Sequence, residues 1–238
     1  MTSSALALGD RVFLVTGGGG AIGQPIVRAF VRAGGKVAVV ERRPDVASIE
    51  KEGALPVAAD LSTPEGAEAM VRETRARFGR VDGLVHTIGG FAMGKVHEAD
   101  VATYERMFDL NVRTLFLAIR AVMPGFLAQN SGFVCGFASL PAWTGSAPGS
   151  GLYGAAKSAV ATMLRSLEGD LHGTDIGVSI VYPMGVVDTP ANRKDMPGQD
   201  PKAWIDPEEI AQSILFAATR SPRGRILELP VSASPRRA

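Results

Sequence analysis

Short runs of apolar residues recur along the chain, without the polar alternation of strands that face water on one side. Such continuous apolarity is typical of strands buried on both faces of a parallel sheet. From these runs we predict six strands, at residues 12–15, 36–40, 54–58, 83–85, 132–135 and 178–181.

Longer segments with a helical spacing of apolar positions alternate with these runs. The clearest helix start is Asp206, an N-cap residue followed by Pro207 and two glutamates in the first turn. Alternating strands and helices predict an α/β fold, a doubly wound, Rossmann-like parallel sheet with helices on both faces. The predicted helices span about 22–33, 64–78, 101–129, 151–171 and 207–219.

No repeat, low-complexity tract or linker divides the chain, so we expect a single domain at residues 11–231 between tails at 1–10 and 232–238. Residues 234–238 are expected to fray. The first ten residues have no basic n-region or apolar h-region, and no stretch has the ~18 continuous apolar residues of a membrane span. We therefore expect a cytoplasmic protein.

The 238 residues are 46% hydrophobic, which is enough for one large core. Lys and Arg number 25 against 24 Asp and Glu, and the net charge of +1 gives no electrostatic argument for binding nucleic acid or a membrane. A small-molecule substrate is the better expectation. The single cysteine, Cys135, lies in an apolar run, which indicates a buried hydrophobe and excludes an internal disulfide.

Tyr153 and Lys157 lie four residues apart in a predicted helix and so share one helical face. A phenol with a pKa of about 10 is a poor acid or base near neutrality unless a fixed cation favours the phenolate, and Lys157 is such a cation. Ser139, at the end of a predicted strand, can hydrogen-bond a carbonyl or hydroxyl held before the tyrosine. Together they predict a proton-transfer site. The alternative is a solvated lysine beside a half-buried ring.

Residues 16–23, Thr-Gly-Gly-Gly-Gly-Ala-Ile-Gly, directly follow the first strand and open the first helix. Glycines let the backbone turn tightly and approach a pyrophosphate, whose charge the helix N-terminus meets. Glu41 lies 24 residues after Gly17, close to the ~20 expected for a ribose-binding carboxylate. The alternatives are a flexible loop and a solvated charge. Asp60 either accepts from an adenine amino group or caps the turn before Ser62.

The order and spacing of these motifs resemble the short-chain dehydrogenases/reductases over nearly the whole chain. The resemblance implies about seven strands, with Tyr153 as acid/base and Ser139 orienting the substrate. Lys157 would bind the nicotinamide ribose and depress the pKa of the tyrosine, and Asn111 would hold a water for proton relay. The matching residues are the glycine-rich motif, Asp60, Asn111, Ser139, Tyr153, Lys157, Pro183 and the segment 188–190.

The resemblance also implies a nicotinamide dinucleotide cofactor. Glu41 disfavours NADP(H), because the 2′-phosphate would meet an anion there, whereas Arg42 and Arg43 could pair with that phosphate. We expect NAD(H) to be preferred, with NADP(H) possible. The implied cofactor contacts are Gly17, Gly19, Gly20, Ile22, Glu41, Arg42, Asp60, Leu61, Gly89, Tyr153, Lys157, Pro183, Val186 and Thr189.

The chain departs from the family pattern at several places. Ala21 replaces a glycine of the motif, which still leaves room for close approach. The family's Asn-Asn-Ala-Gly is His-Thr-Ile-Gly at residues 86–89, where His86 either contacts adenosine or satisfies buried backbone groups. With no cysteine or carboxylate cluster nearby, a metal site is not expected. Beside the substrate, the interval from Ser139 to Tyr153 is one residue longer than usual, and Met184 replaces the glycine after Pro183.

A narrower resemblance, to dihydropteridine reductases, lies in residues 86–90, 188–197 and Trp204. Those enzymes lack the catalytic serine and asparagine that Ser139 and Asn111 supply here, so the substrate stays open. Trp143, Met184, Met196 and Trp204 either form an apolar, aromatic lid over the substrate or pack the loops.

The predicted reaction is hydride exchange between the nicotinamide C4 and a carbonyl or secondary alcohol, with Tyr153 as acid/base. The alternatives are reduction of a quinonoid pterin and a catalytically silent dinucleotide-binding scaffold. Helices 101–129 and 151–171 carry more apolar positions than one sheet face covers, and members of the family pair through these helices. We expect a homodimer or homotetramer with twofold symmetry.

Overall fold

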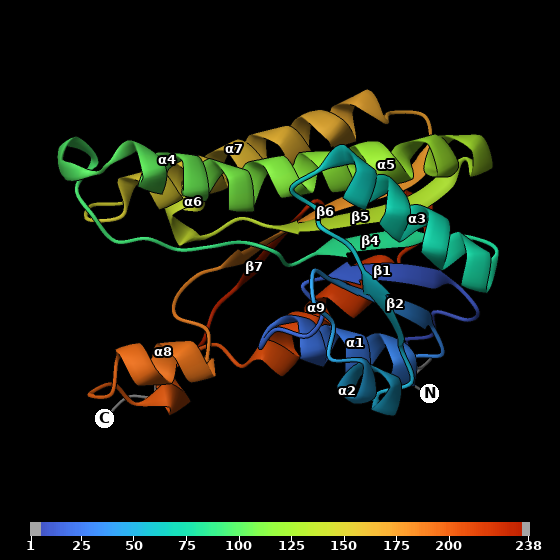
Figure 1. The fold of residues 1–238 in the computed structure, drawn as a ribbon, viewed down its shortest axis with the longest axis horizontal. Coiled ribbons are helices and arrows are strands. Elements are labelled where there is room, and N and C mark those ends of the chain that lie inside the picture. The colour runs from blue at the N-terminus through green and yellow to red at the C-terminus, as the bar shows by residue number, and fades with distance from the viewer. Residues whose placement is uncertain (1–5, 235–238) are drawn as a thin grey trace.

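The computed structural model describes residues 6–234, which form a seven-stranded parallel sheet in the order β3-β2-β1-β4-β5-β6-β7 (Figure 1). The predicted doubly wound α/β fold is confirmed. The order reverses between β1 and β4, which is where folds of this type bind ligands. The strands are β1 Val12–Thr16, β2 Lys36–Glu41, β3 Leu55–Ala58, β4 Gly83–His86, β5 Ser131–Phe137, β6 Asp175–Pro183 and β7 Glu228–Val231.

Helices cover both faces of the sheet (Figure 1). One face carries α3, α5 and α7, and the other carries α1 and α9, which pack against each other. The helices are α1 Gly23–Arg32, α2 Val46–Lys51, α3 Pro64–Phe78, α4 Val101–Phe108, α5 Thr114–Gln129, α6 Leu140–Thr144, α7 Gly151–Asp170, α8 Pro190–Asp195 and α9 Pro207–Ala218.

Each central strand contributes to two cores. Leu14 of β1 packs in the core under α3, α5 and α7, whereas Phe13 and Val15 pack in the core under α1 and α9. Successive side chains of a strand point to opposite faces, so a strand covered on both sides must be apolar at every position. This is why the continuous apolar runs located the central strands.

The predicted helix at 101–129 is interrupted by a π-helical turn, Asp109–Arg113, which separates α4 from α5 and carries the buried Asn111. Such turns are frequent at functional sites. The helical stretch Val101–Gln129 is long and apolar enough, by length and composition, to cross a membrane, and 44% of its apolar window is buried in the fold. A core helix passes the same test, so the finding assigns no membrane span.

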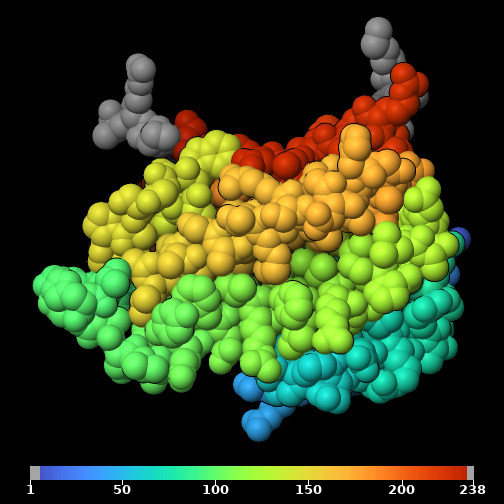
Figure 2. Space-filling view, turned by 90° about the horizontal axis from the view of Figure 1, so that it is seen from above, coloured from blue at the N-terminus to red at the C-terminus, as the bar shows by residue number. Residues whose placement is uncertain are grey.

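The expected surplus of apolar positions on the long helices is only partly correct. Met107, Leu115, Ile119, Phe126 and Leu164 are buried in the monomer, because the sheet and the neighbouring helices cover them. The large apolar side chains that stay exposed on this face are Val101, Tyr104, Leu110, Phe116 and Leu127. Figure 2 shows α4 and α5 side by side with α7 on this face.

The sequence patterns missed β7, α2, α6 and α8. β7 is an edge strand without a fully buried residue, so its apolar signal is weak. The three helices have only five or six residues, too few to show a period. Two of them have a recognisable start, because Asp45 and Thr189 accept hydrogen bonds from the first turns of α2 and α8.

Leu8, which the sequence analysis places in a tail, is 3% exposed and its N–H donates to the carbonyl oxygen of Ala33 at 2.8 Å. The folded part of the chain therefore begins before residue 11. The predicted fraying of the last residues falls, beyond Ser234, outside the described part of the chain.

Candidate active site

The carboxyl edge of the sheet brings together residues that are far apart in the sequence. Because all strands are parallel, their carboxyl ends meet at the same edge. Thr16, Glu41, His86 and Pro183 end β1, β2, β4 and β6, and Asp60 and Ser139 lie two residues beyond β3 and β5.

The glycine-rich turn after β1 has no room for side chains at two positions. Gly17 has φ 72°, and a Cβ there would lie 2.6 Å from Thr87 Oγ1. A Cβ on Gly23 would lie 2.3 Å from the carbonyl oxygen of Gly17, so α1 begins in direct contact with the turn. Gly19 and Gly20 lie between these two positions. The arrangement leaves a bare backbone at a helix N-terminus, which suits a pyrophosphate.

Glu41 lies beside this turn, as predicted for the end of β2. Its Oε1 accepts a hydrogen bond from the N–H of Gly19 at 2.8 Å. A cavity of about 120 Å³ lies between the glycine turn and α2, and its lining includes the carboxylates of Asp45 and Glu52. This side of the turn is therefore acidic.

Asp60 has the turn-capping role that the sequence left open. Its Oδ1 accepts from the N–H of Ser62 at 3.0 Å and from the Ser62 hydroxyl at 2.7 Å, and these bonds lower the pKa of Asp60. The charge of the exposed Arg42 lowers it further. Leu61 is 3% exposed and its side chain packs in the core, so any contact of Leu61 with a cofactor must come from its backbone.

Tyr153 lies in the first turns of α7, and burial raises the pKa of its phenol. The nearby hydroxyl of Ser139 lowers the pKa of Tyr153 and so partly offsets this rise, although the hydroxyls of Ser139 and Tyr153 do not form a hydrogen bond of normal geometry. Ser139 Oγ is buried and has no hydrogen-bond partner among the described residues. A buried hydroxyl without a partner is available to a ligand. The depression of the Tyr153 pKa expected from Lys157 is not found, because desolvation dominates.

The polar side-chain atoms of Lys157 and Asn111 both lie close to Gly89. A Cβ on Gly89 would lie 2.7 Å from Asn111 Oδ1 and 3.2 Å from Lys157 Nζ. Lys157 Nζ donates to the carbonyl oxygen of Phe137 at 2.9 Å, and desolvation lowers its pKa to about 8. Asn111 Nδ2 donates to the carbonyl oxygens of Met107 at 2.9 Å and of residue 90 at 3.1 Å. The structure thus brings the predicted lysine and asparagine together.

His86 is a buried structural residue. Its Nδ1 is 2.8 Å from Thr16 Oγ1, and its Nε2 is 3.1 Å from Thr114 Oγ1. Desolvation, with a smaller contribution from the charge of Lys157, lowers the pKa of His86 to about 3. Both ring nitrogens have partners and the side chain is 2% exposed, so His86 does not reach an adenosine. Of the two roles that the sequence left open for His86, the structure has the structural one, with threonine side chains as partners in place of backbone groups.

Phe91 is a site residue that the sequence analysis missed. Its ring meets the ring of Tyr153 edge-on, with centroids 4.9 Å apart, and it is 60% exposed. Met93 and Val96, in the same loop after β4, are also largely exposed. The N–H of Gly94 donates to the carbonyl oxygen of Gly149 at 2.7 Å, which ties this loop to the start of α7. The signal in the sequence that could have identified Phe91 is its position as an apolar residue directly after the pair Gly89-Gly90.

The sequence left two roles open for Trp143, Met184 and Trp204, a lid over the substrate or packing of the loops. Trp204 is 8% exposed, and its indole N–H donates to Gln199 Oε1 at 3.3 Å, so it packs its own loop. Trp143 is 45% exposed and contacts the ring of Tyr182 edge-on at 5.0 Å. Met184 is half-buried against the core. Trp143 alone among these three stays freely accessible.

The segment after β6 carries the remaining predicted cofactor contacts. Pro183 ends β6, and the carbonyl oxygen of Val186 accepts from the N–H of Ile205 at 2.8 Å. Thr189 is the N-cap of α8, where its Oγ1 accepts from the N–H of Asn192 at 3.2 Å. Ile22, at the start of α1, is half-buried against the core.

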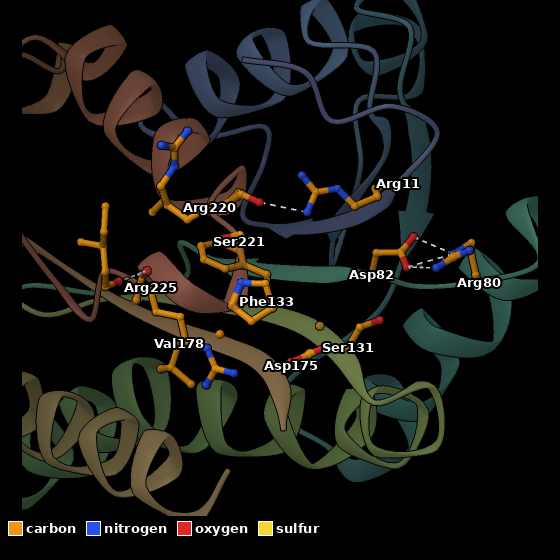
Figure 3. A pocket seen from close by; sticks show the side chains of 17 residues that line it. Arg11, Arg80, Asp82, Ser131, Phe133, Asp175, Val178, Arg220, Ser221 and Arg225 are labelled. Carbon is orange, nitrogen blue, oxygen red and sulfur yellow. Dashed lines mark hydrogen bonds and ion pairs between the residues drawn. The ribbon is translucent and has the colours of Figure 1, made fainter. Parts of the chain in front are cut away.

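A larger cavity, of about 250 Å³, lies at the opposite edge of the sheet and is lined by arginines and aspartates (Figure 3). Arg80 is bound bidentately by Asp82, Arg11 donates to the carbonyl oxygen of Ala218 at 2.9 Å, and Arg220 points away from the cavity. The hydrogen-bond donors of Arg80 and Arg11 are therefore already used within the protein. We therefore place the candidate site at the carboxyl edge, beside Tyr153. Among residues 6–234, no group of three or more His, Cys, Asp or Glu is placed to hold a metal ion.

The chain is similar to several known proteins. The family profile described as short chain dehydrogenase matches residues 11–200. An uncharacterised oxidoreductase of Staphylococcus haemolyticus is 32% identical, covering 94% of this chain and 97% of its own. The 2-(S)-hydroxypropyl-CoM dehydrogenase 3 of Xanthobacter autotrophicus is 29% identical, and the match covers 88% of this chain and 89% of that protein. The crystal structure of gox2181 superposes with a TM-score of 0.84 at 26% identity, covering 94% and 96%.

Proposed function

The chain belongs to the short-chain dehydrogenase/reductase family, and we propose that it transfers a hydride between the nicotinamide C4 of NAD(H) and a ketone or secondary alcohol. One observation carries the proposal: an unpartnered Ser139 hydroxyl beside Tyr153, with Lys157 one turn further along α7. A phenol, a free hydroxyl donor and a buried cation are the groups that proton transfer to a developing alkoxide requires.

Tyr153 would move the proton. Because burial raises its pKa, the phenol is protonated at neutral pH and can act as the acid in reduction. Ser139 Oγ would donate a second hydrogen bond to the same substrate oxygen. Lys157, with a pKa of about 8, is largely charged at pH 7 and would supply positive potential. Asn111, which meets Lys157 at Gly89, would help to hold the proton-relay water.

The residues around the glycine turn fit a dinucleotide. Side chains are excluded at Gly17 and Gly23, as expected where a backbone must approach a pyrophosphate. When bound, the nicotinamide supplies or accepts the hydride. Glu41 beside the turn, with Asp45 and Glu52 behind it, supports a preference for NAD(H), because a 2′-phosphate would meet several carboxylates.

Arg42 was the strongest argument for NADP(H). Its side chain is exposed, and its charge makes the smallest contribution to the lowered pKa of Asp60. Arg42 therefore keeps NADP(H) as an alternative. NAD(H) remains the proposed cofactor, with NADP(H) as a weaker alternative.

The apolar loop after β4 supports a substrate with a bulky apolar substituent. Phe91 touches Tyr153 and exposes most of its surface, as do Met93 and Val96. A carbonyl group held at the Tyr153 hydroxyl would place its substituents near these side chains. One relative is named for a secondary alcohol, 2-(S)-hydroxypropyl-CoM, which is compatible with this reaction class.

The two alternative functions have weaker support. Among the residues that favour a pterin, Trp204 is buried and Arg193 makes two hydrogen bonds to Asp188, at 2.6 and 2.7 Å, which makes both less available to a ligand. A catalytically silent scaffold does not fit a chain whose family and named relatives are oxidoreductases.

The first prediction tests the role of Tyr153. The variant Tyr153→Phe should lose turnover of carbonyl compounds with NADH while keeping its affinity for NADH within about 3-fold, because the hydroxyl serves the reacting centre rather than the cofactor complex. Initial rates over a panel of ketones, from small to aryl-substituted, measure the first quantity, and NADH fluorescence titration measures the second.

The matched control is Tyr104→Phe, which removes the phenol of an exposed tyrosine on α4. It should leave the rate unchanged. A Tyr153→Phe enzyme that keeps more than about a tenth of the wild-type rate, a loss below ~1.4 kcal/mol in transition-state stabilisation, would remove Tyr153 from the acid/base role.

A further inference from the structure

His86 connects two loops of the candidate site. It ends β4 directly beside Thr16, which ends β1 and precedes the glycine turn. Its ring lies between the hydroxyls of Thr16 and Thr114, at 2.8 and 3.1 Å. Thr114 begins α5, immediately after the π-helical turn that carries Asn111.

The hydrogen bonds of this network run in one direction. The Thr114 hydroxyl donates its only proton to the carbonyl oxygen of Leu110 at 2.7 Å, so it must accept from His86 Nε2–H. Nδ1 of the neutral ring then accepts from the Thr16 hydroxyl. The low pKa of His86, about 3, keeps the ring neutral, so only one of its nitrogens carries a proton.

Leu110 is the neighbour of Asn111 in the π-helical turn. In a π-helical turn the backbone N–H bonds to the carbonyl oxygen five residues earlier, as that of Thr114 does to Asp109, and a carbonyl oxygen can accept a second donor through its other lone pair. The Thr114 hydroxyl is such a second donor for the carbonyl of Leu110, and His86 fixes the direction in which that hydroxyl points. Thr87, the residue after His86, donates from its hydroxyl to the carbonyl oxygens of Thr16 and Gly17, at 2.8 and 3.1 Å.

We propose that His86 is a positioning residue: through Thr114 and Leu110 it holds the π-helical turn, and thereby sets the place of Asn111 beside Lys157. The inference rests on the proposed function for its catalytic consequence, but not for its structural part. A histidine suits the task because its two ring nitrogens can bond two elements on opposite sides at once. An amide side chain presents both its polar atoms at one end.

The test uses near-isosteric variants of the full-length protein. Thr114→Val removes the hydroxyl that joins His86 to Leu110, and Thr114→Ser restores it. His86→Phe keeps a planar ring but removes both nitrogens. The matched control is Thr74→Val, because Thr74 is equally buried and its hydroxyl bonds to the carbonyl oxygen of Met70 in α3, far from this network.

Hydrogen exchange by mass spectrometry gives a readout that needs no substrate. Thr114→Val and His86→Phe should speed exchange in peptides covering 109–113 by about 5-fold or more, because opening of the π-helical turn becomes easier. Thr114→Ser should return to the wild-type rate, and Thr74→Val should change exchange only in α3. Unchanged exchange at 109–113 in both variants, each shown by thermal melting to be folded, would overturn the inference.

Kinetics test the catalytic part. Thr114→Val should lower kcat by about 10-fold with the Kd of NADH within about 3-fold, and in an Asn111→Ala background it should add less than about 2-fold, since both changes act through one group. Fully additive losses would overturn the positioning role. If Tyr153→Phe and Asn111→Ala keep full turnover, the proposed function fails, whereas the exchange readout still decides whether His86 holds the turn.

Discussion

Lys157 and His86 are basic side chains buried at the candidate site, and burial lowers the pKa of both. The common cause of both lowered pKa values is the free-energy cost of removing a cation from water. Lys157 still carries its charge at neutral pH, so the fold holds a destabilising buried cation where the proposed chemistry needs one. Active sites typically contain groups that lower the stability of the fold but serve the reaction.

The second prediction concerns the pH dependence of stability. The pKa of Lys157 is about 8 in the folded chain against an ordinary lysine value of 10.5, so between these pH values the unfolded state binds more protons. The contribution of Lys157 to the free energy of unfolding therefore rises with pH across this window, by ~3 kcal/mol at most. Lys157→Met should lack this rise. Urea denaturation of both proteins from pH 7 to 10.5 measures it, and parallel profiles would contradict it.

The third prediction concerns Glu41 and cofactor choice. Wild-type enzyme should favour NADH over NADPH in kcat/KM by ~1 to 3 kcal/mol, because a 2′-phosphate would approach the Glu41 carboxylate. Glu41→Ser should narrow or invert the ratio. Glu50→Ser is the matched control, since it removes an exposed carboxylate from nearby α2. A wild type that prefers NADPH, or an unmoved ratio in Glu41→Ser, excludes Glu41 as the discriminating residue.

Among the elements, α5 begins and ends in unusual backbone conformations. It starts from the π-helical turn, and it ends at Asn130, which has φ 47° and ψ 33°. Asn130 is the only residue other than glycine with a positive φ between residues 6 and 234. Asparagine and glycine tolerate this left-handed conformation at a helix C-terminus. Alanine, whose side chain is a single methyl group, has no interaction that would offset the strain of the conformation.

The fourth prediction follows from this cap. Asn130→Ala should lower the free energy of unfolding by about 1 kcal/mol, and Asn130→Gly should leave it unchanged or raise it slightly, because glycine adopts the conformation without strain. Chemical denaturation at fixed pH gives both values. Equal stabilities of the Ala and Gly variants would show that the cap conformation is not what constrains this position.

For the whole molecule, one face carries several large exposed apolar side chains. Tyr104, Phe116 and Leu127 are each about half exposed, and Val101 is 70% exposed. They lie on α4 and α5, beside α7 (Figure 2). Several large exposed apolar side chains on neighbouring helices are a candidate interaction surface. A surface that pairs with its own copy forms a closed, twofold assembly.

The fifth prediction is that the protein is a dimer or tetramer built through this face. Phe116→Glu combined with Leu127→Glu should reduce the mass measured by light scattering at micromolar concentration, because each charge would be buried without a partner. Val46→Glu is the control, since Val46 is similarly exposed but lies on α2 at the other face. A monomeric wild type, or an unchanged mass in the double variant, would contradict the assignment.

By itself, the sequence determined the fold class and the elements on which several candidate site residues lie. Continuous apolar runs located six strands, because strands covered on both faces cannot alternate with polar residues. The spacing from Tyr153 to Lys157 placed both on one helix face, and Glu41 was placed at the end of a strand. These predictions succeeded because they depend on local periodicity and on distances along the chain.

The tertiary structure decided what depends on neighbours distant in the sequence. Burial raised the pKa of Tyr153 where sequence reasoning expected a lysine to lower it, and burial of Trp204 decided for loop packing, one of the two roles that the sequence left open. The edge contact of Phe91 with Tyr153 and the bridge from Thr16 through His86 to Thr114 join separate elements. Solvent exposure and non-local hydrogen bonds exist only after the strands align, so no local pattern could specify them.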